Sequence, residues 1–246
     1  MSCWRSASPP PPRGTSASVT AVIAAAGSGE RLGAGGPKAF VPLAGRPMVE
    51  WSIEAFRAAE SVRSIVVACP PGHLDELDGR GLELVEGGAT RAASVANALA
   101  AVDTELVAIH DAARPLLDAA LVEAVVATLV ADPGADGAIA AAPVTDTIKQ
   151  AAAAGEEAAP EVVGATLDRE RLWAAQTPQV FRTEALGGAL AQASSIVATD
   201  EAMLVEAAGG RVLIHPASPR NLKVTTPLDL RLAALLLAER GDGASA

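Results

Sequence analysis

The sequence predicts an α/β fold with three layers, in which helices cover both faces of a mostly parallel, mixed sheet. Three observations predict it. The 246 residues are enough for one large domain with a substantial core. Short apolar runs alternate with segments whose apolar residues recur at helical spacing. The motifs that suggest chemistry follow predicted strands, at the sheet edge where open α/β folds bind ligands.

The first half of the chain supplies most of the predicted sheet. Its apolar runs are short and contain valine, isoleucine and alanine, as buried parallel strands do. The predicted strands lie at 18–26, 63–70, 82–87 and 105–112. The segments between them have apolar residues on one helical face, so we expect helices there. The predicted helices lie at 48–59, 94–102 and 118–132.

The second half begins with a strand at 137–144 and then departs from the alternation. Two strand-like pieces flank a turn rich in glycine, glutamate and alanine, which predicts a β-hairpin arm at about 143–172. Two strands alone are marginally stable in water, so we expect the arm to contact a second subunit in a homodimer. "AQTPQVF" is interpreted as a tight loop bounded by proline. A helix at 199–209, a strand at 211–218 and a helix at 227–240 complete the domain.

Both ends of the chain are expected to lie outside the domain. Residues 1–17 are rich in proline and serine without hydrophobic periodicity, which is typical of a disordered tail. The domain is predicted to span 18–238, and 239–246 to form a flexible C-terminal tail.

Composition excludes several classes of function. The net charge of −10 disfavours nucleic acid as a partner. No apolar run approaches the roughly 20 residues that cross a membrane. The two cysteines indicate free thiols in a reducing cytoplasm rather than a disulfide framework, and their spacing from the three histidines matches no zinc motif. The composition remains compatible with a small anionic ligand if a few of the 19 lysines and arginines converge on one site.

The segment "AAAGSGERLGAGGPKAF", at 24–40, is the first candidate for chemistry. A glycine-rich loop after a strand can turn backbone N–H groups toward phosphate oxygens. Arg31 and Lys38 add two cations suited to charge on a phosphoryl group. The loop matches neither the P-loop nor the dinucleotide fingerprint. The alternative is a glycine-rich turn with two solvated cations.

Two further loops follow predicted strands. Gly88 precedes a helix expected to start near Ser94, and their N–H and hydroxyl groups could hold a base or a ribose. Asp111 and Arg114 follow the strand at 105–112, where a carboxylate can bind a sugar hydroxyl or a divalent metal. The alternatives are an ordinary capped helix and a turn aspartate. His110 is interpreted as a packed structural histidine.

The remaining candidates lie in the second half of the chain. Thr147 and Arg169 belong to the predicted arm, Thr177 to "AQTPQVF", and Lys223 to a predicted short strand before the last helix. The alternatives are hairpin surface charges and a solvated lysine.

Together these segments resemble the 2-C-methyl-D-erythritol 4-phosphate cytidylyltransferase family of the non-mevalonate isoprenoid pathway. The resemblance covers about Ser18 to Leu237. The matching pieces are "AAGSGERLGAGGPK", "GGATRAASV", "HDAARP", "PVTDTIK", "LDRERLW", "QTPQVF", "ATDEAMLVE" and "NLKVTTPLDL".

The resemblance implies a Rossmann-like nucleotidyltransferase fold and a defined reaction. The substrate phosphate attacks the α-phosphorus of CTP in line, which releases pyrophosphate and gives 4-diphosphocytidyl-2-C-methyl-D-erythritol. Mg²⁺ is expected on the triphosphate, with Asp111 as a candidate contact. The partners implied are CTP, 2-C-methyl-D-erythritol 4-phosphate and a second copy of the chain.

The resemblance also assigns roles to residues. Arg31 and Lys38 would neutralise the reacting phosphoryl group, and Arg169 and Lys223 would hold the attacking phosphate, Arg169 from the partner's arm. Thr147 and Thr177 would bind the methylerythritol part. The other expected substrate-binding residues are Ala25, Ala26, Gly27, Ser28, Gly29, Gly88, Ala89, Arg91, Ser94, Asp111, Ala112 and Arg114.

Three positions depart from residues that are common in this family: Ala39, Ala89 and Glu201. No expected cation is lost. Two other functions remain open at this point. One is a cytidylyltransferase for another polyol phosphate such as ribitol 5-phosphate, and the other is a non-catalytic nucleotide-binding module.

Overall fold

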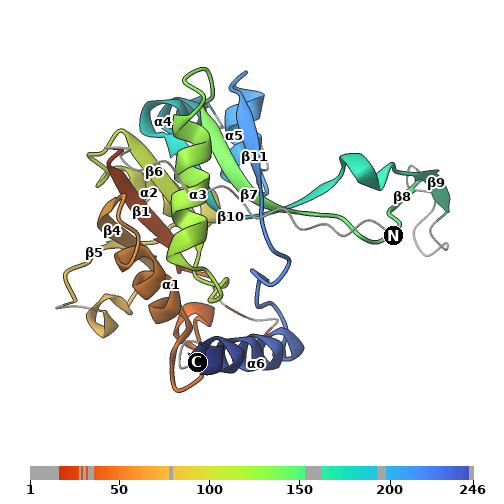
Figure 1. Cartoon of the computed structure of the whole chain (residues 1–246). Coiled ribbons are helices and arrows are strands. Elements are labelled where there is room, and N and C mark those ends of the chain that lie inside the picture. Colours follow the sequence, from red (N-terminus) through yellow and green to blue (C-terminus); the bar gives the residue numbers. More distant parts are fainter. Residues whose placement is uncertain are drawn as a thin grey trace.

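The computed structural model describes residues 17–243 except 28, 30–31, 33–35, 78–79, 153–161 and 193–197. It is built on a seven-stranded sheet in the order β11–β7–β10–β6–β1–β4–β5 (Figure 1). Neighbouring strands are parallel, except that β10 runs antiparallel to both β6 and β7. The strands are β1 (Val19–Ala24), β4 (Val62–Cys69), β5 (Glu83–Glu86), β6 (Leu106–Asp111), β7 (Gly137–Pro143), β10 (Trp173–Arg182) and β11 (Val212–Pro216).

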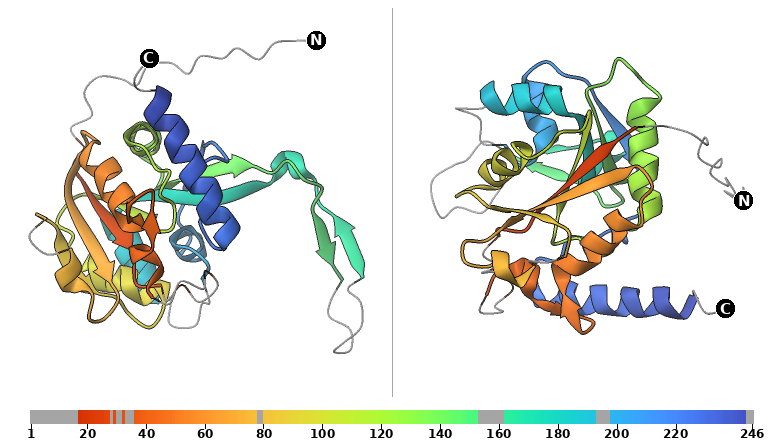
Figure 2. Two further views of the ribbon diagram at one scale, coloured as in Figure 1. Left: turned by 90° about the horizontal axis from the view of Figure 1, so that it is seen from below. Right: turned by 90° about the vertical axis from the view of Figure 1, so that its left-hand side faces the viewer.

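Helices cover both faces of this sheet, which confirms the predicted three layers (Figure 2). One core contains side chains of α1 (Met48–Arg57) and α3 (Ala119–Val130). The other contains side chains of α2 (Arg91–Leu99), α4 (Thr183–Gln192) and α5 (Glu201–Ala207). Short 3₁₀ helices are η2 (Lys38–Phe40), η3 (Leu74–Glu76) and η4 (Arg169–Arg171).

The first strand shows why the sequence reads as a continuous apolar run. Ala21 and Ile23 pack into the core with α1 and α3, whereas Val22 packs into the core on the opposite face. Successive side chains of a strand point to opposite faces, so a strand covered on both sides must be apolar throughout. The central position of β1 therefore follows from "VTAVI".

The last helix packs at one end of the sheet. α6 (Pro227–Gly243) buries Ala233 and Leu237 against a small cluster that includes Leu43, from the hairpin β2 (Pro42–Leu43) and β3 (Arg46–Pro47). The helix extends past residue 238, so the expected tail at 239–246 is wrong as far as 243. Residues 1–16 and 244–246 lie outside the described residues.

The predicted arm is present as a hairpin. β8 (Lys149–Ala151) and β9 (Val163–Thr166) pair antiparallel, with Lys149 opposite Thr166. The arm extends from the ends of β7 and β10 away from the central sheet (Figure 1). Side chains along both of its strands are exposed.

The interpretation of "AQTPQVF" as a loop is wrong. Residues Gln176–Phe181 are buried within β10, between β6 and β7. The pairing with β7 shifts register between Ala175 and Gln179, which accommodates Pro178, a residue that cannot donate to the ladder. Sequence analysis also missed α4, whose pattern is interrupted by Gly187 and Gly188, residues of low helix propensity.

No helix in the described part of the chain is both long enough and apolar enough to cross a membrane.

Candidate active site

A cavity of about 410 Å³ opens where β1 and β6 end, beside the loop that follows β5. Because β1 and β6 are parallel, with Ala24 opposite Asp111, the loops that leave them meet at one edge of the sheet. This is the edge where open α/β sheets bind ligands.

Most of the predicted site residues line this cavity, although they come from four separate segments. Thr90 and the small residues Ala24, Ala39 and Ala113 also line it; they lie in the motifs quoted above but were not among the predicted site residues. The predicted residues that line the cavity are Ala25, Ala26, Gly27, Lys38, Gly88, Ala89, Arg91, Ser94, Asp111, Ala112 and Lys223.

The glycine-rich loop closes directly onto Lys38. The Lys38 N–H donates to the Gly27 carbonyl oxygen over 3.2 Å. Gly29 has φ of 74°, and a Cβ there would lie 2.9 Å from the Lys38 Cβ, so this position excludes any side chain. Gly29 shapes the loop without lining the cavity. Ser28 and Arg31 lie outside the described residues, and their roles stay predictions.

The loop after β5 packs against the glycine-rich loop. A Cβ on Gly87 would lie 2.3 Å from the Ala26 Cβ, and a Cβ on Gly88 would lie 2.4 Å from the Ala93 Cβ. Both distances are far below van der Waals contact, so the glycine pair lets two loops and a helix meet at the cavity. The "GG" motif therefore has a packing reason as well as the predicted ligand-binding one.

Helix α2 begins earlier than predicted. It starts at Arg91, and the Thr90 hydroxyl caps it by accepting the Ala93 N–H over 3.1 Å. Ser94 is therefore inside the first turns of the helix rather than at its start. Its hydroxyl accepts the Gly88 N–H over 3.0 Å and donates to the Thr90 carbonyl over 2.9 Å. Ser94 thus holds the loop that carries Gly88.

Asp111 lies between two cations. Its Oδ1 accepts from Arg91 Nε over 2.9 Å, and its Oδ2 is 2.7 Å from Lys223 Nζ. Burial opposes ionisation of this carboxyl, but the charges of Arg91 and Lys223 outweigh it and hold its pKa well below the usual range. Asp111 is therefore a carboxylate at every pH at which the protein works.

Arg91 is held on its other side by Glu201. Arg91 Nη1 donates to both carboxylate oxygens of Glu201, which is only 1% exposed. Burial lowers the pKa of Arg91, but Asp111 and Glu201 raise this pKa by more than burial lowers it. The guanidinium therefore stays charged. Burial raises the pKa of Glu201, against the effect of Arg91. Sequence analysis noted Glu201 only as a departure; its single signal was an acid at the start of a helix.

Thr177 is buried behind the cavity rather than exposed in it. Its Oγ1 accepts the Asp111 N–H over 3.2 Å and lies 2.8 Å from His110 Nδ1. His110 is fully buried, and burial lowers its pKa to about 3, so it is a neutral packed residue as predicted. Thr177 does not line the cavity, so a molecule bound there would not make the expected contact with its side chain.

Arg114 also acts behind the cavity. Its Nη1 donates to the Asn221 carbonyl over 2.8 Å and its Nη2 to the Ala175 carbonyl over 3.2 Å. The Val224 N–H donates to the Ala113 carbonyl over 2.8 Å. These bonds join the end of β6 to the segment that carries Lys223, and so they place Lys223 beside Asp111.

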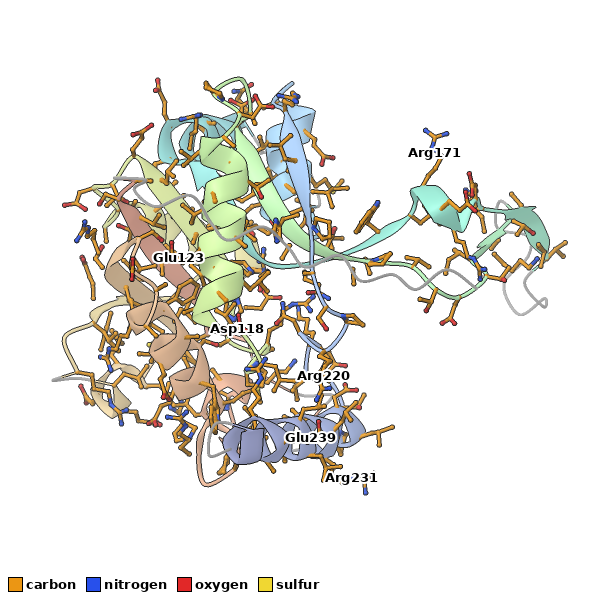
Figure 3. The ribbon with its side chains drawn as sticks, in the orientation of Figure 1. Asp118, Glu123, Arg171, Arg220, Arg231 and Glu239 are labelled. Carbon is orange, nitrogen blue, oxygen red and sulfur yellow. The ribbon has the colours of Figure 1, made fainter. Side chains whose placement is uncertain are left out.

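The two predicted residues of the arm do not reach this cavity within the chain. Thr147 and Arg169 are exposed, and Arg169 Nη1 donates to the Thr145 carbonyl over 2.7 Å. Neither lines the cavity. Figure 3 shows Arg171, two residues after Arg169, on the arm away from the helices and sheet.

A second cavity, of about 580 Å³, lies between α3, α6 and the segment after β11. Its charged groups pair with one another: Arg220 contacts Glu239 (Figure 3), and Arg240 lies 3.8 Å from Asp118. The cavity therefore lacks the excess of cations that the first one has.

The described residues include no group of three histidine, cysteine or acidic side chains placed to hold a metal ion. Asp111, the expected contact for Mg²⁺, has both oxygens engaged by cations. A metal at this site would therefore need ligands from a bound molecule.

Comparison with known proteins places this geometry in a family. The family model described as "IspD: 2-C-methyl-D-erythritol 4-phosphate cytidylyltransferase" matches residues 19–239. A protein of that name from Dechloromonas aromatica is 43% identical over 233 residues, covering 89% of this chain and 97% of the relative. Another from Symbiobacterium thermophilum is 42% identical, covering 90% and 93%. The crystal structure of the enzyme of that name from Thermus thermophilus superposes with a TM-score of 0.72 at 37% identity, covering 88% and 98%.

Proposed function

The chain belongs to the 2-C-methyl-D-erythritol 4-phosphate cytidylyltransferase family, and on this premise we propose that it transfers CMP from CTP to 2-C-methyl-D-erythritol 4-phosphate. The products are 4-diphosphocytidyl-2-C-methyl-D-erythritol and pyrophosphate. One observation of the structure carries the proposal most directly: Lys38, Arg91 and Lys223 line the same cavity of a chain with net charge −10.

Both substrates are polyanions, so their mutual repulsion is the first obstacle to reaction. In a partly enclosed cavity, fixed cations interact with phosphate charges more strongly than they would in water. Lys38, which begins η2 after the glycine-rich loop, is assigned to the triphosphate of CTP. Lys223, on the opposite segment, is assigned to the attacking phosphate. The nucleotide part binds against the small residues of the loops after β1 and β5, largely through backbone groups.

The reaction is a direct displacement. An oxygen of the methylerythritol phosphate bonds to the α-phosphorus of CTP as the bond from that phosphorus to the bridging oxygen breaks. Pyrophosphate leaves with the bridging oxygen. The nucleophile is already an anion, so no base is required, and buried His110 is not available as one. Orientation and charge stabilisation supply the catalysis.

The ion pair between Lys223 and Asp111 has a place in substrate binding. An incoming phosphate dianion competes with the Asp111 carboxylate for the Lys223 ammonium, which lies 2.7 Å from it. When Lys223 contacts the phosphate, Asp111 Oδ2 becomes free to accept a hydroxyl of the polyol. The exchange leaves each charged group with a partner, which limits the desolvation penalty.

In this proposal, the arm of a second copy of the chain completes the site of the first copy. Arg169 and Thr147 are exposed and line neither of the two cavities described above, and Val162 and Val163 on the arm are 68% and 59% exposed. An isolated hairpin with apolar side chains in water is marginal, so a contact surface on another subunit is expected. In a two-fold dimer each arm would place Arg169 at the partner's cavity, where its planar guanidinium suits phosphate oxygens.

Mg²⁺ is included as the cofactor, carried by the phosphate oxygens of CTP, where it would offset negative charge on the triphosphate. Asp111 is not included among its ligands, because both carboxylate oxygens contact cations in the free protein and the oxygen released by Lys223 is assigned to a polyol hydroxyl. A cytoplasmic location is part of the proposal and is supported by the low cysteine content and by Cys69, a buried free thiol whose pKa burial raises to about 11.

The test is pyrophosphate release from CTP with each of two polyol phosphates. We expect rapid release with 2-C-methyl-D-erythritol 4-phosphate and little with ribitol 5-phosphate. The relatives carry the methylerythritol name, so the ribitol alternative is not favoured. Preference for ribitol 5-phosphate would overturn the substrate assignment, and CTP binding without release with either compound would overturn the enzyme assignment.

A further inference from the structure

Two motifs whose residues have no role in the proposed chemistry, "QTPQVF" and "ATDEAMLVE", meet beside the cavity. Gln179 of β10 accepts the Ala202 N–H over 3.2 Å and donates to Asp200 Oδ2 over 2.9 Å. Asp200 in turn caps α5 by accepting the Met203 N–H over 3.0 Å. Gln179 of β10 therefore fixes the first turn of α5, where Glu201 lies.

Glu201 has no direct access to a substrate. Its side chain is 1% exposed and does not line the cavity. Both of its oxygens accept from Arg91 Nη1, and Arg91 does line the cavity. The hydrogen bonds that connect Glu201 to the cavity therefore pass through Arg91.

The contacts continue from Arg91 to the groups assigned to the polyol phosphate. Arg91 Nε donates to Asp111 Oδ1 over 2.9 Å, and Asp111 Oδ2 is 2.7 Å from Lys223 Nζ. A guanidinium is planar and its donors have fixed directions, so carboxylates on two of its edges determine its orientation.

We infer that Glu201 is a positioning residue for the transfer reaction: it holds Arg91 so that Arg91 fixes the Asp111 carboxylate, and Asp111 sets the starting position of Lys223. The inference rests on the proposed function, because it assigns Glu201 to the polyol phosphate side of that site. With a neutral side chain in place of Glu201, the Arg91 cation loses one of its two carboxylate partners. Arg91 then turns toward phosphate groups in the cavity, and Asp111 loses its fixed orientation.

The first test compares Glu201→Gln with Glu201→Asp, which keeps the charge on a shorter side chain. Glu201→Gln should raise KM for the polyol phosphate about tenfold or more and change KM for CTP less than about twofold, because the displaced groups face the polyol phosphate. Glu201→Asp should recover part of this loss. Glu206→Gln is the matched control, because Glu206 is an exposed glutamate on the same helix. An unchanged KM for the polyol phosphate in Glu201→Gln, or equal increases for both substrates, overturns the inference.

A double-mutant cycle separates positioning from a general loss of structure. In an Arg91→Ala background, Glu201→Gln should have a much smaller effect on KM for the polyol phosphate than it has alone, because the hydrogen bonds that connect Glu201 to the cavity are gone. The effect of Glu201→Asp on this KM should be reduced in the same way in the Arg91→Ala background. Glu201→Asp can therefore replace Glu201→Gln in the cycle if Glu201→Gln folds poorly. Effects of Glu201 and Arg91 that multiply would contradict the inference.

A spectroscopic measurement keeps this inference separate from the proposed function. The Arg91 Nε–H signal, assigned by its disappearance in Arg91→Lys, should exchange slowly with water in the wild type and faster in Glu201→Gln. Unchanged exchange overturns the inference whether or not the protein releases pyrophosphate. No pyrophosphate release by the wild type, with faster exchange in Glu201→Gln, overturns the proposed function alone.

Discussion

The cavity and the arm carry residues assigned to the same reaction, but the fold surrounds them differently. Asp111 is 7% exposed, ends a central strand, and is held by Arg91, Lys223 and Thr177. Arg169 is exposed on a short 3₁₀ helix, where one bond to the Thr145 carbonyl is described. The sheet can fix a side chain within the tolerance that catalysis needs, and an exposed hairpin cannot. The arm residues therefore need a second surface before they can contribute.

Lys38→Ala should have the largest effect, because it removes a cation that lines the cavity of its own chain. We expect turnover to fall about a hundredfold or more, the usual scale for losing one preorganised group in the transition state. Steady-state pyrophosphate release measures it. Arg63→Ala, which removes an exposed cation on β4, is the control and should leave turnover unchanged. Wild-type turnover in Lys38→Ala would remove Lys38 from the mechanism.

Arg169→Ala should have a narrower effect, because the arm is assigned only to the polyol phosphate. We expect KM for that substrate to rise about tenfold to a hundredfold, while calorimetry shows unchanged CTP affinity. Arg171→Ala changes an exposed arginine of the same 3₁₀ helix and is the matched control. Loss of CTP affinity in Arg169→Ala would show that the arm is assigned to the wrong substrate.

A pair of threonines compares the two regions in stability rather than activity. Thr177→Val leaves the Asp111 N–H without its buried acceptor, so the free energy of unfolding should fall by about 1–3 kcal/mol. Thr147→Val on the exposed arm should change it by less than about 0.5 kcal/mol. Urea unfolding of both variants measures the difference. Equal losses would mean that Thr177 has no structural role behind Asp111.

A further comparison is the dependence of stability on pH that comes from the cavity side of the molecule. Burial lowers the pKa of His110 to about 3, from 6.5 for a free side chain. Below pH 6.5, His110 therefore binds a proton in the unfolded chain but stays neutral in the folded chain. The stability that neutral His110 gives is full above pH 6.5. It is lost as pH falls toward 3, at roughly 1.4 kcal/mol per pH unit.

Urea unfolding at pH 7 and pH 5 tests this slope. His110→Asn should show a shallower loss of stability between the two values than the wild type, whatever its stability at pH 7. The arm at 143–172 contains no histidine, so the slope can be assigned to the sheet. A wild-type slope in His110→Asn would contradict the assignment.

How far the sequence predicted this molecule depended on whether a residue's partners lie nearby in the chain. Continuous apolar runs and helical patterns placed most strands and helices, and the segments that follow strands located Lys38 and Asp111. Lys223 was expected in a short strand, and this expectation is wrong, because residues 222–225 form no strand. β10 was missed because its buried residues include Pro178 and several polar side chains, which are typical of a loop. Glu201 was missed because its partner Arg91 lies 110 residues earlier.

Thr177 shows a different limit. A hydroxyl beside a proline in a conspicuous motif could bind a ligand or satisfy a buried N–H, and the residue type does not separate the two. Only the position of β10 between β6 and β7, with Asp111 N–H 3.2 Å from the Thr177 hydroxyl, decides for the second.

The most direct test of the central claim, that each cavity is completed by the arm of another chain, mixes Lys38→Ala chains with Arg169→Ala chains. Random mixing gives heterodimers in which one cavity has both Lys38 and a partner Arg169. At a polyol phosphate concentration well below its wild-type KM, the account predicts recovery of about a quarter of the wild-type rate, with neither variant active at that level alone. No recovery in verified heterodimers would contradict it and would mean that each site is built within a single chain.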